Sequence, residues 1–461
     1  MLIRFKVGNF LSFDEVQEFS MIAGQTRSKQ ERVFKDKDNL KLLKFGSVFG
    51  SNASGKSNLI KAVYFAQFVL RQGEFKVPAN NYFKLKEENK NKPSYFEFEI
   101  KRGNKYYAYG FELMLSQGQL LSEWLYEIKK DASHPIFKRD IGNKKIDNFL
   151  NISSRLLKNK FSVYSDDIKD NPNVFFLKDI NSKGNSIFIQ KSEILIFKEI
   201  YDWICNSINI ILPSTVSEFN YILNKESNYE RICEIITAFG TGISNYEIKE
   251  SSLDEYDNLS FQDKALVLNL IANAKRDLQN NPSLKDKNGN IAFTSRSADN
   301  FLVIECPTDS DKMSVKTLHF KHGSQYLNFE EESDGTKRLF DFIEILISSE
   351  DKIYFVDELD RSLHPQLTRK FIETFLSISK TKNTQLVITT HESRLLDLDL
   401  LRRDEIWFID KDNSGATSLY SLDEYNERFD KKIDKAYLEG RYGGVPAFNL
   451  IYPNIGEVYE D

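Results

Sequence analysis

The sequence predicts an α/β protein with a mixed central sheet, a flanking antiparallel β-subdomain and an inserted helical lobe. Three observations lead to this fold class. An apolar strand runs into a glycine-rich loop at Phe45–Asn58, runs of alternating polarity begin at Ser94, and segments with helical spacing fill much of the stretch between about 145 and 300. The expected parts of the chain are therefore an N-terminal part at 1–145, the helical lobe at 146–300 and a C-terminal part at 301–461.

The glycine-rich loop reads FGSVFGSNASGKSN, and its residues fill the pattern G-x-x-x-x-G-K-[ST]. Glycines let the backbone bend around an anion, and a helix that begins near Lys56 turns its positive end toward it. Lys56 would pair with the β- and γ-phosphates of a nucleotide, and the Ser57 hydroxyl would bind Mg²⁺. A plain glycine-rich turn is the alternative, and the strand and helix around the loop disfavour it. The expected nucleotide contacts are Gly50, Ser51, Asn52, Ala53, Ser54, Gly55, Lys56, Ser57 and Asn58.

A second candidate motif lies far downstream, where Ile353–Leu359 reads IYFVDEL. This apolar strand ends in two adjacent acids. Asp357 would hold the Mg²⁺ shell, and Glu358 could polarise a water that is lined up with the γ-phosphate. An ordinary buried strand capped by charges is the alternative, but the phosphate loop earlier in the chain favours the functional interpretation.

Two further motifs flank this acidic strand. Upstream, ESDGTKR opens an apolar helix, so that a capping serine, a glycine and the helix dipole form a second anion site at Ser333, Gly335 and Thr336. Downstream, LVITTH ends at His391, which could hydrogen-bond a γ-phosphate oxygen. Taken alone, these motifs would also fit a simple helix cap and a surface histidine. The loop Asp360–Pro365 between them is polar and suits a subunit contact.

Composition narrows the class of protein. The chain has 461 residues and a net charge of −5, which argues against a generally basic nucleic-acid binder. Its three cysteines lie far apart, so neither a zinc site nor a disulfide framework is indicated and a reducing cytoplasm is expected. The N-terminus has no signal-peptide core and no window is apolar enough to span a membrane. No heptad pattern is sustained, which excludes a long coiled coil.

The order of these motifs resembles that of ATP-binding-cassette (ABC) ATPases, including the chromosome-maintenance and double-strand-break-repair branch. It looks closest to compact bacterial ATPases of phage-defence operons, a group often catalogued as "AAA family" that includes abortive-infection and PARIS-type ATPases. The segments RRDEIWFIDKD (Arg402–Asp412) and YLEGRYGGVP (Tyr437–Pro446) also look like that group. The resemblance covers about Met1–Glu127 and Val315–Pro446, and it is weak in the helical lobe.

This resemblance implies an ABC-type P-loop NTPase that binds ATP and Mg²⁺ and hydrolyses ATP. It makes the loop residues Walker A, Asp357 the Walker B acid, Glu358 the catalytic base, Ser333 and Gly335 the signature, and His391 the switch. In such families the signature serves the ATP of the opposite subunit, so a head-to-tail dimer or a larger homo-oligomer is expected. The chain departs from the family pattern at Asp334, which replaces a glycine, and at Leu11, which replaces an arginine. No Q-loop glutamine is assigned.

Three functions are compatible with these motifs. The leading one is an ATP-driven switch that controls a separate effector, such as a Toprim-type nuclease, with a phage protein as a trigger. The second is a DNA-repair ATPase that clamps duplex DNA, and the third, a transporter subunit, is disfavoured by the size of the inserted lobe. Glu439, Asp410 and Asp412 are interpreted as loop charges, so no nuclease is expected in this chain. The basic residues that could form a DNA-binding face are Lys84, Lys86, Lys90, Lys92, Lys101, Lys105, Arg155, Lys158 and Lys160.

Overall fold

The computed structural model divides the chain into two compact units. The first unit comprises Met1–Ile210, Asp351–Leu359 and Ser379–Asp461, and the second comprises Ile211–Glu350 and Asp360–Ile378. The structure describes residues 1–442 except 27, 73–79, 130, 185–186, 189–191, 216–221, 223–224, 254–260, 278–289, 297–300, 309–311, 349–350, 426–432 and 439–440. Glu439, interpreted above as a loop charge, lies outside the described residues, as do parts of the segment Tyr437–Pro446.

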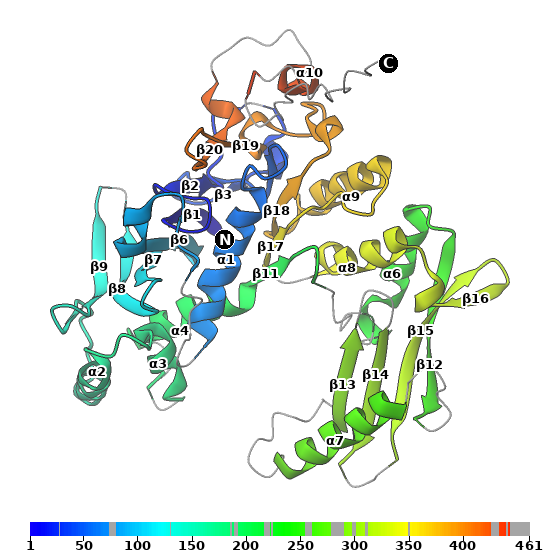
Figure 1. Cartoon of the computed structure of the whole chain (residues 1–461), viewed down its shortest axis with the longest axis horizontal. Coiled ribbons are helices and arrows are strands. Elements are labelled where there is room, and N and C mark those ends of the chain that lie inside the picture. Colours follow the sequence, from blue (N-terminus) through cyan, green and yellow to red (C-terminus); the bar gives the residue numbers. More distant parts are fainter. Residues whose placement is uncertain are drawn as a thin grey trace, which may run out of the picture. The chain divides into compact units, whose positions relative to one another are not determined.

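A six-stranded mixed sheet forms the centre of the first unit (Figure 1). Its order is β11-β17-β18-β5-β19-β20, and β17, β18, β5 and β19 are parallel while β20 is antiparallel to β19. Every residue of β5, β17 and β18 is buried, which is typical of parallel strands covered on both faces. The strands are β5 (Phe45–Phe49), β11 (Ile208–Ile211), β17 (Ile353–Val356), β18 (Gln385–Thr390), β19 (Ile406–Lys411) and β20 (Thr417–Ser421).

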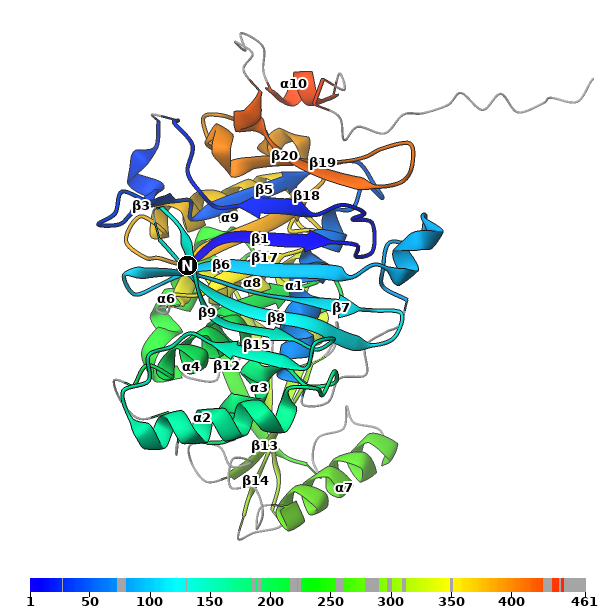
Figure 2. The same ribbon diagram turned by 90° about the vertical axis from the view of Figure 1, so that its left-hand side faces the viewer.

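An antiparallel sheet of seven strands is the second layer of this unit, and Figure 2 shows β1 and β6 to β9 side by side within it. Its order is β10-β9-β8-β7-β6-β1-β2. The predicted flanking β-subdomain is therefore confirmed, because the alternating residues after Ser94 form β6, β7 and β8. The strands are β1 (Leu2–Gly8), β2 (Gln17–Ser20), β6 (Ser94–Arg102), β7 (Lys105–Met114), β8 (Gln119–Ile128), β9 (Ser133–Asp140) and β10 (Lys145–Asn148).

Helices of the first unit pack on these sheets through aromatic side chains. α1 begins directly after the glycine-rich loop, and its Phe65 lies against Phe10 and Phe96 with ring centroids 4.9 and 5.3 Å apart. On the antiparallel sheet, Phe137 stacks on Phe176 at 4.4 Å. The helices are α1 (Lys56–Arg71), α2 (Arg155–Ile168), α3 (Phe176–Ser182), α4 (Leu195–Asp202), a π-helical turn η3 (Trp203–Ser207) and α10 (Ile433–Leu438).

Short elements complete the first unit. A small hairpin pairs Phe34 and Lys35 with Leu42 and Lys41. The remaining elements are the strands β3 (Phe34–Lys35) and β4 (Lys41–Leu42) and the 3-10 helices η1 (Gln30–Arg32), η2 (Glu87–Asn91), η6 (Ser393–Leu395), η7 (Arg403–Glu405) and η8 (Leu422–Glu424).

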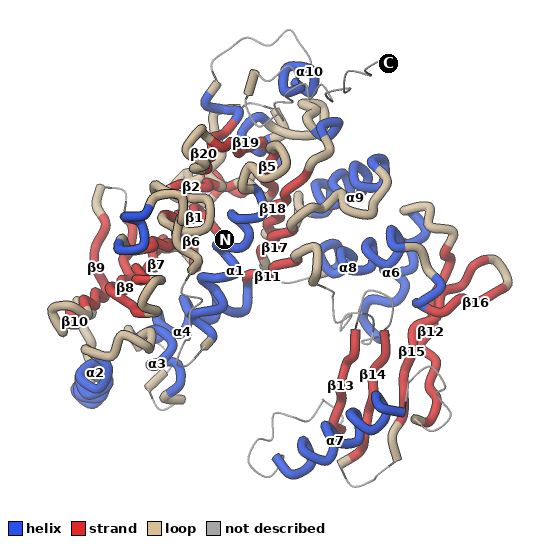
Figure 3. The backbone as a smooth tube through the Cα atoms, viewed as in Figure 1, coloured by secondary structure: helices blue, strands red, loops and turns tan. Residues whose placement is uncertain are grey.

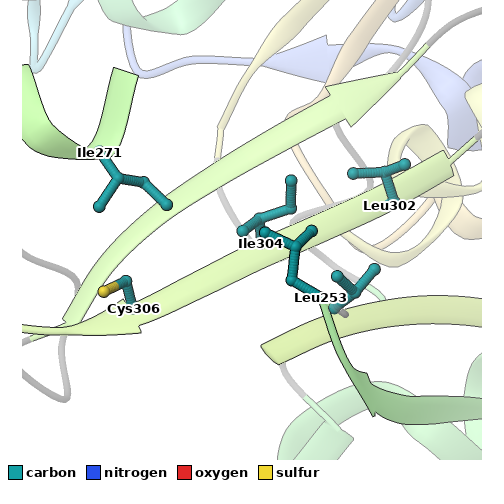
Figure 4. Packing of buried hydrophobic residues seen from close by; sticks show 6 residues of the cluster. Leu253, Ile271, Leu302, Ile304 and Cys306 are labelled. Carbon is teal, nitrogen blue, oxygen red and sulfur yellow. The ribbon is translucent and has the colours of Figure 1, made fainter. Parts of the chain in front are cut away.

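The second unit is built on a five-stranded antiparallel sheet with helices, distinguished by colour in Figure 3. Its core is a cluster that includes Leu253, Ile271, Leu302, Ile304 and Cys306 (Figure 4). The strands are β12 (Ile243–Ser252), β13 (Asn290–Arg296), β14 (Phe301–Pro307), β15 (Ser314–His322) and β16 (Gln325–Asn328), and the helices are α6 (Lys225–Ala238), α7 (Phe261–Asp277), η5 (Phe329–Glu331), α8 (Asp334–Ile347) and α9 (Pro365–Ile378).

The segment 146–300 is less helical than the sequence suggested. Helices α6 and α7 lie where the helical spacing predicts them, but β12 and β13 are strands. Their polar residues looked like joints between helices, whereas β12 pairs with β15 along its full length, from Ile243 opposite His322 to Ser252 opposite Ser314. Long-range pairing thus overrides weak local preference. The division at 145 and 300 remains a proposal about domain organisation. No helix within the described ranges exceeds the 17 residues of α7, in line with the predicted lack of a long coiled coil.

Candidate nucleotide site

The glycine-rich loop leaves β5 at Phe49 and turns sharply into α1. Gly55, which precedes α1, has φ 113°, and Ala53 has φ 65°. A Cβ at Gly50 would lie 2.5 Å from the Ile409 carbonyl oxygen, and one at Gly55 would lie 2.5 Å from Thr417 Oγ1. Both positions therefore require glycine, and this backbone fits the anion cradle that the motif predicts.

Lys56 holds its ammonium group against this loop. Its Nζ donates to the carbonyl oxygens of Gly50 at 2.7 Å and Ser51 at 2.8 Å, and it lies 3.3 Å from His391 Nδ1. The side chain is buried, so the charge faces the loop rather than bulk solvent. His391 is brought here because β18 runs parallel to β5 with Thr390 opposite Phe49, so that the residues after both strands meet.

Asp357 and Ser57 meet at the same edge of the sheet. Ser57 Oγ donates to Asp357 Oδ1 at 3.1 Å, and Asp357 is only 2% exposed. A hydroxyl and a carboxylate are oxygen ligands that suit Mg²⁺, which usually takes one or two protein ligands and completes its shell with phosphates and waters. No group of three or more His, Cys, Asp or Glu residues that could form an all-protein cage occurs in the described part of the chain. The residues present thus fit Mg²⁺ bound together with a nucleotide.

Glu358 stands next to Asp357 on a left-handed backbone with φ 53°. Its N–H donates to Thr389 Oγ1 at 2.8 Å, and the side chain is half-buried. A non-glycine residue in this conformation is held there by its surroundings and is common at active sites. The predicted loop, acids and histidine are therefore all gathered within the first unit.

Two hydroxyl side chains, those of Ser12 and Thr417, support the loop through hydrogen bonds, and this was not predicted from the sequence. Thr417 Oγ1, from β20, donates to the Ser54 carbonyl oxygen at 2.8 Å and lies 2.8 Å from Ser12 Oγ. Asn58 Nδ2 also donates to Ser12 Oγ at 2.8 Å. Ser12 belongs to the NFLSF turn, so this turn supports the loop through its serine, while Leu11 donates its N–H to the Asn81 carbonyl oxygen. The only sequence signal was a polar residue inside an aromatic turn.

The signature motif lies in the second unit, at the start of α8. Ser333 is the N-cap, and its Oγ accepts from the Thr336 N–H at 3.2 Å, so part of the predicted capping interpretation holds. A Cβ at Gly335 would lie 2.9 Å from the Ser362 carbonyl oxygen, which explains the glycine. Asp334 is exposed.

A cavity of about 600 Å³ opens beside this motif, within the same unit. Asp334 is not among the lining residues, so the carboxylate that departs from the family pattern does not face the cavity. Two helix starts, those of α8 and α9, contribute to its wall together with a lysine and a histidine. The lining residues are Phe239, Gly240, Thr241, Ser333, Gly335, Thr336, Ser362, His364, Gln366, Leu367 and Lys370.

The fold and the loop define a P-loop protein of the ATPase class. The model of the family described as "AAA domain, putative AbiEii toxin, Type IV TA system" matches residues 47–204 and 216–397. Because these segments make up well over half of the chain, the protein belongs to this family. No curated protein matches.

Solved structures of chromosome-maintenance (SMC) head domains are also similar. A crystal structure of SmcHead bound to the C-winged helix domain of ScpA matches with 12% identity and a TM-score of 0.37, covering 91% of this chain and 97% of the other. The SMC head domain from Thermotoga maritima matches with 12% identity and a TM-score of 0.33, covering 91% of this chain and 98% of the other. The Smc head domain with an extended coiled coil bound to the C-terminal domain of ScpA, derived from Pyrococcus furiosus, matches with 14% identity and a TM-score of 0.34, covering 95% of this chain and 98% of the other. At TM-scores below 0.5, these similarities say nothing of the activity or the partners of this chain.

The helices do not include a candidate membrane span. None within the described ranges combines the length and the apolar character that crossing a bilayer requires.

Proposed function

We propose that the protein binds ATP at the loop of its first unit, hydrolyses it, and uses this cycle as a switch. The observation that carries the proposal is the convergence of Lys56, Ser57, Asp357 and Glu358 at the ends of neighbouring parallel strands. Ligands in open α/β sheets bind at the carboxyl ends of the strands, where these residues lie.

Each residue would have a distinct role. Residues Gly50 to Asn58 would surround the phosphates, with Lys56 neutralising the β- and γ-phosphates. Ser57 and Asp357 would hold Mg²⁺, which neutralises charge on the phosphates when it is bound. Glu358 would accept a proton from the attacking water, and His391 would contact the γ-phosphate from the side of Lys56, since its Nδ1 lies 3.3 Å from Lys56 Nζ.

The signature would act on a nucleotide held by another copy of the chain. Ser333, Gly335 and Thr336 line an open cavity in the second unit, and the loop Asp360–Pro365 contributes Ser362 and His364 to the same wall. A triphosphate contacted from two copies would join them as a head-to-tail dimer or a larger homo-oligomer, and hydrolysis would remove this bridge.

The family description favours a role in defence. Its words, toxin and type IV TA system, suit an abortive-infection ATPase. We propose that assembly controls a separate effector, such as a Toprim-type nuclease, in the cytoplasm, and that a phage protein triggers the change.

Duplex-DNA clamping is less well supported by the described residues. Of the lysines expected to form a basic face, Lys86 pairs with Asp14 and Lys105 with Glu127, while Lys101 lies over the rings of Phe34 and Tyr106. The two ion-paired charges are partly neutralised by their neighbours, which weakens their attraction for phosphates.

The test is to measure phosphate release and molecular mass together. Purified protein with ATP and Mg²⁺ should release phosphate, and its mass should rise to that of a dimer or larger assembly with ATP but not with ADP. A wild-type protein that binds no Mg-ATP would contradict the proposed activity. Binding of ATP without any change in the molecular mass of the protein would contradict only the proposal that two copies share a nucleotide.

A further inference from the structure

Thr389, the second-last residue of β18, contacts both acids of the candidate site. Its Oγ1 donates to Asp357 Oδ1 at 2.6 Å and accepts from the Glu358 N–H at 2.8 Å. The Leu359 N–H donates to the Thr389 carbonyl oxygen at 3.1 Å. Thr389 is fully buried.

The sheet register explains why threonine stands here. β17 and β18 pair in parallel up to Val356 opposite Ile388, so the next position on each strand is Asp357 and Thr389. The two side chains therefore meet where both strands end. A buried hydroxyl is costly unless it is hydrogen-bonded, and Thr389 Oγ1 both donates and accepts a hydrogen bond.

The direction of the two hydrogen bonds limits which residue can take this place. Because the oxygen accepts from the Glu358 N–H, its own hydrogen is available for Asp357, and the carboxylate can only accept it. A group that both donates and accepts is needed. Serine keeps both capacities, whereas valine has the shape of threonine and neither capacity.

Thr389 differs in role from Ser57, the other hydroxyl on Asp357. Both contact Oδ1, but Ser57 is itself a proposed Mg²⁺ ligand, so its oxygen would serve the metal. Thr389 lies on β18, within the sheet, whereas Ser57 lies in the first turn of α1. The hydrogen bond from Thr389 would orient Asp357 whether or not the metal is bound, because residues that hydrogen-bond a metal ligand fix its orientation.

The same side chain holds the backbone of the proposed base. Glu358 has φ 53°, and hydrogen bonds from Glu358 N and Leu359 N to Thr389 close the turn on both sides. Releasing the first of these would let the backbone leave its left-handed conformation, which L residues adopt only when surroundings impose it.

We propose that Thr389 is a positioning residue, which orients Asp357 toward Mg²⁺ and fixes the turn from which Glu358 projects. This inference rests on the proposed ATP hydrolysis and names a residue that the Walker motifs do not contain. It predicts a double defect, in metal use and in the chemical step, from the loss of one hydroxyl.

The experiment compares Thr389→Val and Thr389→Ala with Thr389→Ser, and uses Ser47→Ala as the matched control. Ser47 is fully buried in β5 and its hydroxyl donates to the Glu405 carbonyl oxygen at 2.9 Å, so its loss tests a buried hydroxyl away from the acids. Nucleotide affinity is measured with a fluorescent ATP analogue, first in EDTA and then in a Mg²⁺ titration. kcat and KM for ATP are measured alongside, and thermal unfolding checks that each variant is folded.

For Thr389→Val and Thr389→Ala we expect affinity in EDTA close to wild type. The Mg²⁺ concentration for half-maximal binding should rise, and kcat should fall, each by roughly 10- to 100-fold. Thr389→Ser should restore most of both, and Ser47→Ala should resemble wild type.

Three results would overturn the inference. The first is a folded Thr389→Val or Thr389→Ala variant with unchanged Mg²⁺ dependence and kcat. The second is a Thr389→Ser variant that is as impaired as Thr389→Val, and the third is a defect of equal size in Ser47→Ala. If both apolar variants fail to fold, Thr389→Ser decides, because it must then keep most of the wild-type Mg²⁺ affinity and kcat. A wild-type protein that binds no Mg-ATP would instead refute the proposed function itself, so the two failures are distinguishable.

Discussion

The loop site of the first unit and the signature end of the second unit differ in how complete they are. Around the loop, Lys56 and Asp357 are almost fully buried and already hydrogen-bonded within the unit. At the signature, Ser333 is exposed beside an open cavity. The first arrangement is pre-organised for a ligand, because its groups need little reordering. The second is open on the side of the cavity, and we propose that another copy of the chain completes it.

The substitution Glu358→Gln is expected to have the largest effect at the loop site. We expect the rate of hydrolysis to fall by about 10²- to 10⁴-fold, because general-base catalysis contributes that much, while ATP affinity stays near wild type. Phosphate release and equilibrium binding, measured on the same preparation, give the two values. Unimpaired hydrolysis would show that the base is another group.

Lys56→Ala should weaken ATP binding by roughly 100-fold, since it removes a charged hydrogen-bond donor from the loop. Isothermal titration of ATP with Mg²⁺ gives the affinity. Lys61→Ala is the matched control, because Lys61 is an exposed lysine on the same helix. Tight ATP binding by Lys56→Ala would refute the role of the loop.

Ser333→Ala should lower hydrolysis by roughly tenfold, the value of one hydrogen bond to a charged group, without changing the affinity of a single subunit for ATP. Sedimentation at rising protein concentration with ATP should show weaker assembly. Asp334→Ser, next in sequence but outside the cavity lining, should behave like wild type. Equal effects of both variants would mean that the cavity does not meet a nucleotide.

Thr417→Val should weaken ATP binding by about 3- to 10-fold, because it removes one buried hydrogen bond that supports the loop. Thr417→Ser keeps the hydroxyl and should recover the affinity, which titration of both variants can establish. A loss of equal size in Thr417→Ser would assign the effect to packing.

The last prediction concerns the pH dependence of stability and the buried carboxyl of Glu405, which directly precedes β19. Burial raises the pKa of Glu405 from 4.5 to about 7. Between these values the unfolded chain releases this proton while the folded protein keeps it, so the contribution to stability falls as pH rises and is lost above about pH 7. Glu405→Gln should flatten this decline, measured by urea unfolding from pH 5 to 8. A decline that is just as steep in Glu405→Gln would assign it to other groups.

Much of the loop site could be predicted because its residues are consecutive in sequence and each has a recognisable chemistry. The sequence predicted the strand that leads into the glycine-rich loop, the two acids after one apolar strand and the histidine after another. The structure brings these residues together. Ser12, Thr389 and Thr417 could not be predicted, because their hydrogen bonds join segments that are far apart in the sequence. The strands β12 and β13 were missed for the same reason, since their polar sequences become ladders only beside partners.

The position of β5 in its sheet has a consequence for biosynthesis. Its neighbours on both sides, β18 and β19, are encoded after the whole second unit. During translation, this apolar strand leaves the ribosome long before the strands that shield it, and it must be protected from aggregation in the meantime. The proposed nucleotide site needs β18 and the acids that follow β17, so it forms only after these late segments have been made.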